Sequence, residues 1–202
     1  MIKISRTTIV PIVIGACALT VAGGGATALA HGQRGQVAQS ASSGVHPATN
    51  VTGQGIDQVV VAYDGPNSTV GSAPTPAPLP GMTVQITVPS GFTALLIARF
   101  SAESACYGGD AGQPEWCTAT IKANGVEMSP QTGSDFAFDS TDNGAESNAS
   151  WESHAMERVR RVPAGTYTVR VFGLTTLFGT SQPTFWTGER VLTVESSLTP
   201  AT

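Results

Sequence analysis

The chain has 202 residues, with 10 Lys+Arg against 14 Asp+Glu and a formal net charge of −4. Charged residues make up 12% of the chain, about half of the ~25% that is usual in soluble proteins. This low and slightly acidic charge content argues against a nucleic-acid-binding protein, a coiled coil or a highly charged disordered chain. The hydrophobic share of 41%, with 3 Trp, 3 Tyr and 7 Phe, is enough for one core of ordinary domain size.

Residues 1–30 have the composition of a secretory signal peptide. Lys3 and Arg6 give a basic start, residues 7–21 are uncharged, and Ala28-Leu29-Ala30 has the form of a small-residue cleavage site. We therefore predict cleavage after Ala30 and secretion of the mature protein, which then has no membrane segment. Loss of Lys3 and Arg6 makes the mature chain more acidic, and such a chain is poorly suited to nucleic acid or to anionic membrane surfaces.

Two other interpretations of this segment stay open. Residues 7–30 are uncharged over a length that would span a bilayer if the segment stayed uncut, although their second half is only weakly apolar. Alternatively, Ile14-Gly15-Ala16-Cys17 resembles a bacterial lipobox, in which Cys17 becomes the lipidated first residue. Either alternative would leave the protein attached to a membrane.

Cys106 and Cys117 are the cysteines that remain after cleavage, and we predict a disulfide between them. An even pair of cysteines in an exported chain favours a disulfide. The intervening loop is rich in turn-forming residues, and its closure stabilises the fold by roughly 3 kcal/mol in the chain-entropy model. A metal site or a catalytic thiol fits less well, because no histidine lies near the pair in the sequence.

Composition divides the remaining chain into a linker, a domain and a tail. Residues 31–55 are Gly, Gln, Ala, Ser and Thr with almost no large apolar residue, which predicts a disordered linker. Residues 56–196 form the predicted β-domain, and residues 197–202 a C-terminal tail. Inside the domain, the Pro-rich residues 73–81 favour polyproline and are expected to stay out of the sheet interior, as an ordered connection.

Strand signals recur about every dozen residues after this connection. Asn124-Gly125 predicts a two-residue hairpin turn, and Pro89-Ser90-Gly91 and Pro163-Ala164-Gly165 predict two further turns. Alternation of apolar and polar side chains supports the neighbouring strands, and it places Val84, Ile86 and Val88 on one face of a strand and Phe136 and Phe138 on one face of another. The predicted strands are residues 58–63, 82–88, 92–100, 118–123, 126–128, 135–139, 151–162, 166–172 and 185–195.

These elements predict an all-β fold, an antiparallel β-sandwich of the jelly-roll type with eight or nine strands. No segment shows a helical period of about twelve residues bounded by caps. A jelly roll is favoured over an immunoglobulin-type sandwich, because Cys106 and Cys117 are too close in the sequence to be expected to bridge two sheets.

Several segments carry a resemblance to known proteins. Residues 94–104, Trp116-Cys117, residues 135–142 and residues 151–154 are similar to uncharacterised secreted actinobacterial β-sandwich proteins. Residues 162–169 are distantly similar to the late hairpin of C1q- and TNF-like jelly rolls. The resemblance covers about residues 82–195 and implies the fold and export, and it brings no known activity.

The sequence contains no recognisable catalytic set. His154 is the histidine that lies in the predicted domain, and neither a Gly-x-Ser-x-Gly elbow nor a Ser-x-x-Lys pair accompanies it. Two opposed carboxylates could serve a glycosidase, but the sequence does not show which acidic residues would face each other. The candidates are Asp135, Asp139, Asp142, Glu146, Glu152 and Glu157.

One acidic loop is a candidate calcium site. Asp139, Asp142 and Glu146 offer hard oxygen ligands around a glycine, as Ca²⁺ requires, although their spacing is not that of an EF-hand. A solvated loop with Asx turns is the simpler interpretation. We expect no other cofactor.

Trp116, Trp151 and His154 are the candidate binding residues. Trp116 adjoins the predicted disulfide, where its ring either packs on the sandwich edge, the favoured reading, or faces a ligand. We therefore expect a secreted, non-enzymatic module that binds an unidentified extracellular ligand or protein, with oligomer formation left open. The alternatives are an extracellular glycan-active hydrolase and a structural cell-surface protein.

Overall fold

The computed structural model describes residues 55–70 and 75–202, so the predicted signal peptide, Cys17 and nearly all of the predicted linker lie outside the described residues. In this part of the chain, no helix is long and apolar enough to cross a membrane. The elements are β1 (Gln58–Asp64), β2 (Ser68–Val70), β3 (Ala77–Gly108), β4 (Trp116–Ala123), β5 (Val126–Glu127), β6 (Asp139–Ser140), a 3-10 turn (Asp142–Gly144), β7 (Glu152–Thr176) and β8 (Pro183–Pro200).

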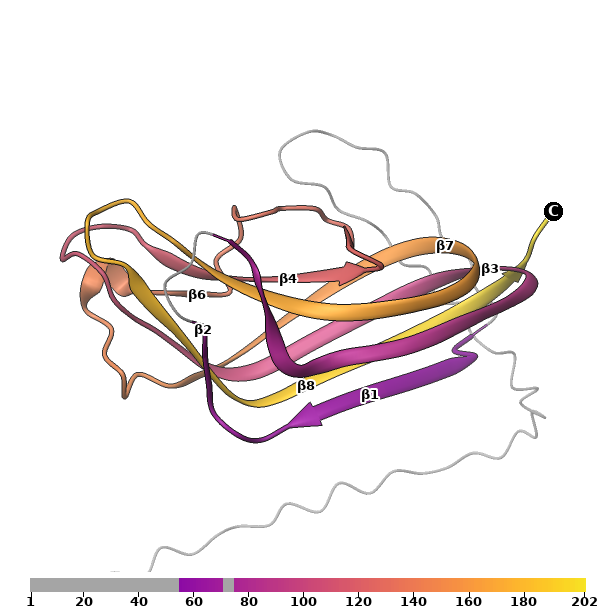
Figure 1. Cartoon of the computed structure of the whole chain (residues 1–202), viewed down its shortest axis with the longest axis horizontal. Helices are drawn as coiled ribbons and strands as arrows, with labels where there is room; N and C mark the ends of the chain where they lie inside the picture. The colour runs from indigo at the N-terminus through magenta and orange to yellow at the C-terminus, as the bar shows by residue number, and fades with distance from the viewer. Residues whose placement is uncertain (1–54, 71–74) are drawn as a thin grey trace, which may run out of the picture. The chain divides into compact units, whose positions relative to one another are not determined.

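The eight described strands form one antiparallel sheet in the order β1-β8-β3-β7-β4-β5, with β2 paired to β8 and β6 paired to β4. This sheet folds over on itself, because β3 and β7 each pass from one layer into the other (Figure 1). We call the two layers by their central strands. The β8 layer contains β1, β2, β8, residues 92–108 and residues 152–163, and the β4 layer contains β4, β5, β6, residues 77–88 and residues 165–176. The predicted antiparallel, jelly-roll-like β-sandwich is confirmed.

The turns predicted at residues 89–91 and 163–165 are bends inside continuous strands. Val88 pairs with Gly165 and Thr93 with Pro163, and the register shifts between these two pairs. Both strands therefore carry a proline and a glycine at the same level of the ladder, where the missing N–H of proline interrupts pairing and glycine permits unusual backbone angles. The paired strands bend together instead of reversing separately, so residues 152–162 and 166–172 are not a hairpin.

The proline-rich connection also differs from the prediction. From Ala77 onwards it belongs to β3, where Pro78 pairs with Phe172 and Leu79 is buried in the core. Residues 77–88 pair with β7 alone, so they are an edge of the β4 layer. An edge strand tolerates proline because its outer side needs no N–H donor.

Several predicted strand boundaries are wrong: β3 continues past residue 100 to Gly108, β7 continues past residue 172 to Thr176, and β2 was not predicted. The predicted tail from residue 197 continues β8 to Pro200, with Leu198 opposite Ala94 and packed against the core. The predicted strand 135–139 is reduced to Asp139–Ser140, because the preceding residues cross the outer side of β4, where the Ser134 carbonyl accepts hydrogen bonds from Trp116 and Thr118. Phe138 nevertheless enters the core as the alternation indicated.

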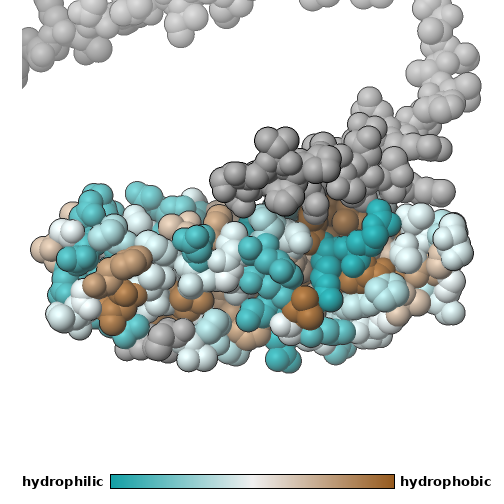
Figure 2. All heavy atoms as spheres, turned by 90° about the horizontal axis from the view of Figure 1, so that it is seen from above, coloured by the Kyte–Doolittle hydropathy of each residue, from teal (hydrophilic) through white to brown (hydrophobic). Residues whose placement is uncertain are grey.

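The core lies between the two layers. Val84, Ile86 and Val88 share the inner face of β3, as predicted, and they belong to one buried cluster with Phe100 and Leu192 of the β8 layer. On the face seen in Figure 2, hydrophobic residues form separate brown groups between teal hydrophilic residues.

A buried ion pair joins the early part of the chain to β8. Nη2 of Arg190 donates to Oδ2 of Asp64 at 2.6 Å and to the Pro66 carbonyl at 2.8 Å, and Nη1 donates to the Thr187 carbonyl at 2.9 Å. Arg190 is almost completely buried. Gly81 has φ of +74°, and any side chain there would collide with the Asp64 carboxylate. The guanidinium thus fixes the turn after β1 against β8 and β3.

We predict that Arg190→Ala lowers the free energy of unfolding by about 3–5 kcal/mol, because it leaves a partly buried carboxylate without its cation. Asp64→Asn should also destabilise the fold, since it removes the charge opposite a buried guanidinium. The exposed Arg170→Ala is the control, with an expected change within about 0.5 kcal/mol. Urea unfolding measures all three, and an Arg190→Ala loss no larger than that of the control would contradict this role.

Candidate functional site

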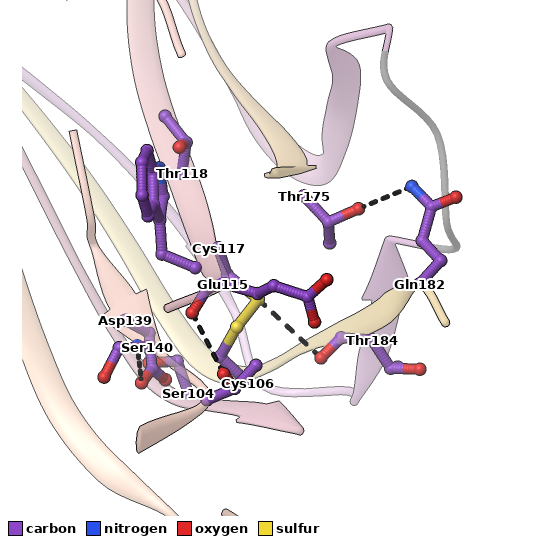
Figure 3. Close-up of a disulfide and its surroundings, with 12 residues drawn as sticks. Ser104, Cys106, Glu115, Cys117, Thr118, Asp139, Ser140, Thr175, Gln182 and Thr184 are labelled. Atoms are coloured by element: carbon purple, nitrogen blue, oxygen red, sulfur yellow. Dashed lines mark hydrogen bonds between the residues drawn. A yellow bond between two sulfur atoms is a disulfide. The ribbon is translucent and has the colours of Figure 1, made fainter. Parts of the chain in front are cut away.

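The disulfide closes the end of the sandwich opposite the bend that β3 and β7 share at residues 88–93 and 163–165. Figure 3 shows the residues around it. Cys106 of β3 lies in the β8 layer, Cys117 of β4 lies in the β4 layer, and both are fully buried. The predicted disulfide is confirmed, with Cα atoms 5.8 Å apart. The expectation that these cysteines cannot bridge two sheets is wrong, because the short loop between them crosses from one layer to the other.

Two carboxylates of this loop hold the neighbouring loop 177–182. Oε1 of buried Glu115 accepts the backbone N–H groups of Phe178 and Gly179, at 3.3 and 3.1 Å. Oδ2 of Asp110 accepts the backbone N–H groups of Thr180 and Ser181. The Ser181 side chain, these N–H groups and the Thr180 hydroxyl hold the pKa of Asp110 well below its usual range.

His154 lies in a polar cluster next to the disulfide. The Ser104 hydroxyl donates to Oδ2 of Asp139 at 2.6 Å and lies 2.9 Å from Nδ1 of His154. On its other side, Nε2 of His154 lies 3.6 Å from a carboxylate oxygen of Glu152. This cluster connects β3, β6 and β7, and Ser104 was not among the residues predicted from the sequence.

The cluster resembles a Ser-His-acid triad in composition and differs from it in geometry. In a triad the hydroxyl donates its proton to the histidine, whereas the Ser104 hydroxyl here donates to Asp139. Ser104 is also fully buried. The arrangement suits a hydrogen-bond network that fixes the two layers against each other.

The calcium candidates are not brought together. Asp139 is turned toward Ser104 and His154, whereas Asp142 is exposed on the 3-10 turn and Glu146 follows it in the loop. Among residues 55–70 and 75–202, no three acidic, histidine or cysteine side chains form a group that could hold a metal.

Trp116 lies on the outer side of the β4 layer. Its Nε1 donates to the Ser134 carbonyl at 2.9 Å, and its ring packs against Phe178 with 5.0 Å between centroids. Trp116 is half-buried, in line with the packing role that the sequence favoured.

Trp151 and Trp186 stack on the outer side of the β8 layer. Their ring centroids are 5.7 Å apart with an interplanar angle of 23°, and Trp151 is 60% exposed. Trp186 pairs with the small Ala105 of β3, which leaves room for the two rings. Nε1 of Trp151 donates to the Asn148 carbonyl, so this ring has a fixed orientation. Trp151 was predicted from the sequence as a candidate and Trp186 was not, because only the strand register brings the two rings together.

Polar side chains adjoin this indole pair. Glu103 pairs with Ser153 on one side and with Gly188 on the other, two residues along β3 from Ala105 and on the same face. Both Glu103 and Ser153 are exposed. A side chain at Gly188 would meet the Trp186 ring at 2.9 Å and the Asn67 amide oxygen at 3.0 Å, so these two groups converge over the glycine.

A depression of about 510 Å³ continues along the same face. Its floor is low because small side chains, Ser101 and Ala155, are paired there. At its far end Arg99 donates to Glu157 at 2.7 Å and to Glu195 at 2.6 Å. The hydrogen bonds that Arg99 donates to Glu195 and Glu157 raise the pKa of Arg99, so this end keeps one cation between two carboxylates.

No family model matches the chain, and no curated protein matches it. Solved structures with similarity include the VP2 subviral particle of infectious bursal disease virus, with a TM-score of 0.43, 15% identity, and coverage of 77% of this chain and 36% of that chain. The structure of the Gt strain of this virus has a TM-score of 0.42 and 12% identity, and the match covers 79% of this chain and 37% of that chain. Dimeric latent PorU from Porphyromonas gingivalis has a TM-score of 0.34 and 12% identity, and the match covers 72% of this chain and 14% of that chain. The chain thus spans well under half of these proteins.

We predict that replacing Cys106 and Cys117 together by serine lowers the free energy of unfolding by about 2–4 kcal/mol and keeps the fold. Loss of the cross-link gives the unfolded chain more freedom, while the buried strands around it stay paired. Urea unfolding and far-UV circular dichroism measure the two effects. Stoichiometric thiol labelling of both cysteines in native, unreduced protein would contradict the disulfide.

We predict that Asp110 stabilises the loop 177–182 at neutral pH and ceases to do so in acid. Its pKa is lower in the folded state than the unfolded value of about 3.9, so its contribution is present above that value and is lost as the pH falls through the folded pKa. Asp110→Asn should therefore increase hydrogen exchange of the Thr180 and Ser181 amides at pH 7. Equal exchange in the variant and the parent at neutral pH would refute this.

Proposed function

We propose that the protein is an exported, non-enzymatic module that binds a neutral glycan chain on the outer face of the β8 layer. The stack of the exposed Trp151 on the half-buried Trp186 is the observation that carries this proposal. A large apolar ring held open to solvent costs hydrophobic free energy in the isolated protein, and a ligand that covers it recovers that energy.

The chemistry beside the rings fits a sugar. The C–H face of a pyranose packs on an indole, while its hydroxyl groups need donors and acceptors at the edge of the ring. Glu103, Ser153 and Asn67 supply these groups within one or two residues of the pair. A purely apolar ligand would leave the Glu103 carboxylate without a polar partner.

The shape and the charge of this face restrict the class of glycan further. Ala105 lies beside the indole pair and Ser101 lines the depression, and these two residues are about 13 Å apart along β3 at ~3.3 Å per residue. The indole pair and the depression together therefore suit an extended chain of several sugars. Carboxylates outnumber the cation along this path, since Arg99 is already paired to Glu157 and Glu195. Electrostatics thus favour neutral or N-acetylated glycans over uronic or sulfated ones.

Export is supported by two observations. The first thirty residues have the order of charge, apolar run and small residues that signal peptides share. The Cys106–Cys117 disulfide belongs to a class of bond that persists in oxidising compartments.

We predict that Trp151→Ala weakens glycan binding at least tenfold, which corresponds to about 1.4 kcal/mol, because the ring is the main apolar contact. Isothermal titration with soluble oligomers of glucose and of N-acetylglucosamine measures this, with a sulfated polysaccharide as the anionic probe. Trp116→Ala is the matched control, since it removes a half-buried indole on the opposite layer, and it should leave affinity within about twofold.

Three outcomes would overturn the proposal. They are the absence of binding to every neutral oligomer, unchanged affinity in Trp151→Ala, and preferential binding of the sulfated polysaccharide. Hydrolysis of an oligomer by the purified protein would replace it with the alternative of a glycan-active hydrolase.

A further inference from the structure

We propose that two copies of this chain associate through β1, which pairs antiparallel with β1 of the second copy across a twofold axis. β1 is the last strand of the β8 layer, and within the described residues it pairs with β8 alone (Figure 1). Its outer edge therefore presents backbone N–H and C=O groups that a further strand can use. This inference stands on β1 itself and does not depend on the glycan proposal.

The edge formed by β1 lacks the features that protect edges from pairing. Residues 58–63 contain no charge, proline or glycine, and β1 pairs with β8 in unbroken register. The opposite edge of the β8 layer, residues 152–163, carries glutamates and arginines, and the edge at residues 77–88 carries prolines. Natural sheets use charges and prolines in this way to prevent association, so β1 stands out as the open edge.

The outer face of β1 is also apolar. Val59, Val61 and Tyr63 alternate along the strand and are 51%, 58% and 71% exposed. On the β8 side they adjoin Glu195, Thr193 and Val191 respectively, and these three side chains leave the stripe uncovered. Burial of exposed valine and tyrosine side chains drives association through the hydrophobic effect.

The sequence of β1 is complementary to itself about Val61, and this identifies a second copy as the partner. A twofold axis at Val61 places Val61 opposite its own copy and Val59 opposite Tyr63 of the other strand. An aromatic ring opposite a β-branched side chain is a favourable cross-strand pair. On the inner face, Gln58 comes opposite Asp64, so an amide donor meets the carboxylate that Arg190 already neutralises. A closed twofold contact of this kind gives a dimer and leaves no growing edge.

Cysteine cross-linking at the axis tests the register directly. We predict that Val61→Cys forms a disulfide-linked dimer under mild oxidation at least tenfold faster than Val126→Cys, with both in a Cys17→Ser background. Directly opposite Cα atoms in an antiparallel pair are ~4.5–5.5 Å apart, which a disulfide can span. Val126 is the matched control because it is a 46% exposed valine on β5 of the other layer.

Sedimentation velocity over a range of concentrations tests the association without cross-links. The parent chain should form dimers, Val61→Lys should shift the population to monomers, and Val126→Lys should behave like the parent. Melting curves check that both variants stay folded. A monomeric parent at millimolar concentration, equal cross-linking rates for the two cysteines, or open-ended polymers instead of dimers would each overturn the proposal.

Discussion

β3 and β7 remain paired while they pass together from the β8 layer into the β4 layer, and the rest of the domain is arranged around this shared bend. Thr93 and Pro163 are seventy positions apart in the chain, and they face each other at the bend. Their pairing places Val88 and Val162 in the same core as the strands on either side. Without it, the halves of each strand would be separate hairpins, and the inner faces of the two layers would have no fixed register. Such non-local pairing is costly in loop-closure entropy, so the bend is expected to form late in folding.

The opposite end of the sandwich has no shared strand to hold it, and side-chain chemistry takes that role. The disulfide joins the layers there, Asp110 and Glu115 bind the loop 177–182, and Ser104 contacts Asp139 across the interior. These contacts use buried or partly buried polar groups, each with a hydrogen-bond partner. They explain why this end contains the cluster around His154 that resembles a catalytic site in composition: polar groups are concentrated where the sheet itself does not close the fold.

The sequence predicted what depends on local pattern and missed what depends on register. Alternation located Val84, Ile86 and Val88 on one buried face, and the spacing of two cysteines identified the disulfide. A proline followed by a glycine gives the same signal for a chain reversal and for a bend, and only the matching Pro–Gly level of the partner strand decides between them. The stack of Trp151 on Trp186 likewise depends on the pairing of three strands, which no local window contains.

Both proposals concern the outer face of the β8 layer, and their geometries are linked. A twofold axis that pairs β1 with its copy is perpendicular to the sheet. The β8 layers of the two copies therefore turn their outer faces to the same side. The indole pair, the depression and the apolar stripe of β1 lie on this face in each copy. Two weak sites that face one surface bind a polymer far more tightly than either site alone, because the second contact is intramolecular. Under the glycan proposal, dimer formation raises the affinity of one shallow site for a polysaccharide in this way. Under the two proposals together, the edge of β1 and the stack of Trp151 on Trp186 are two parts of one binding surface.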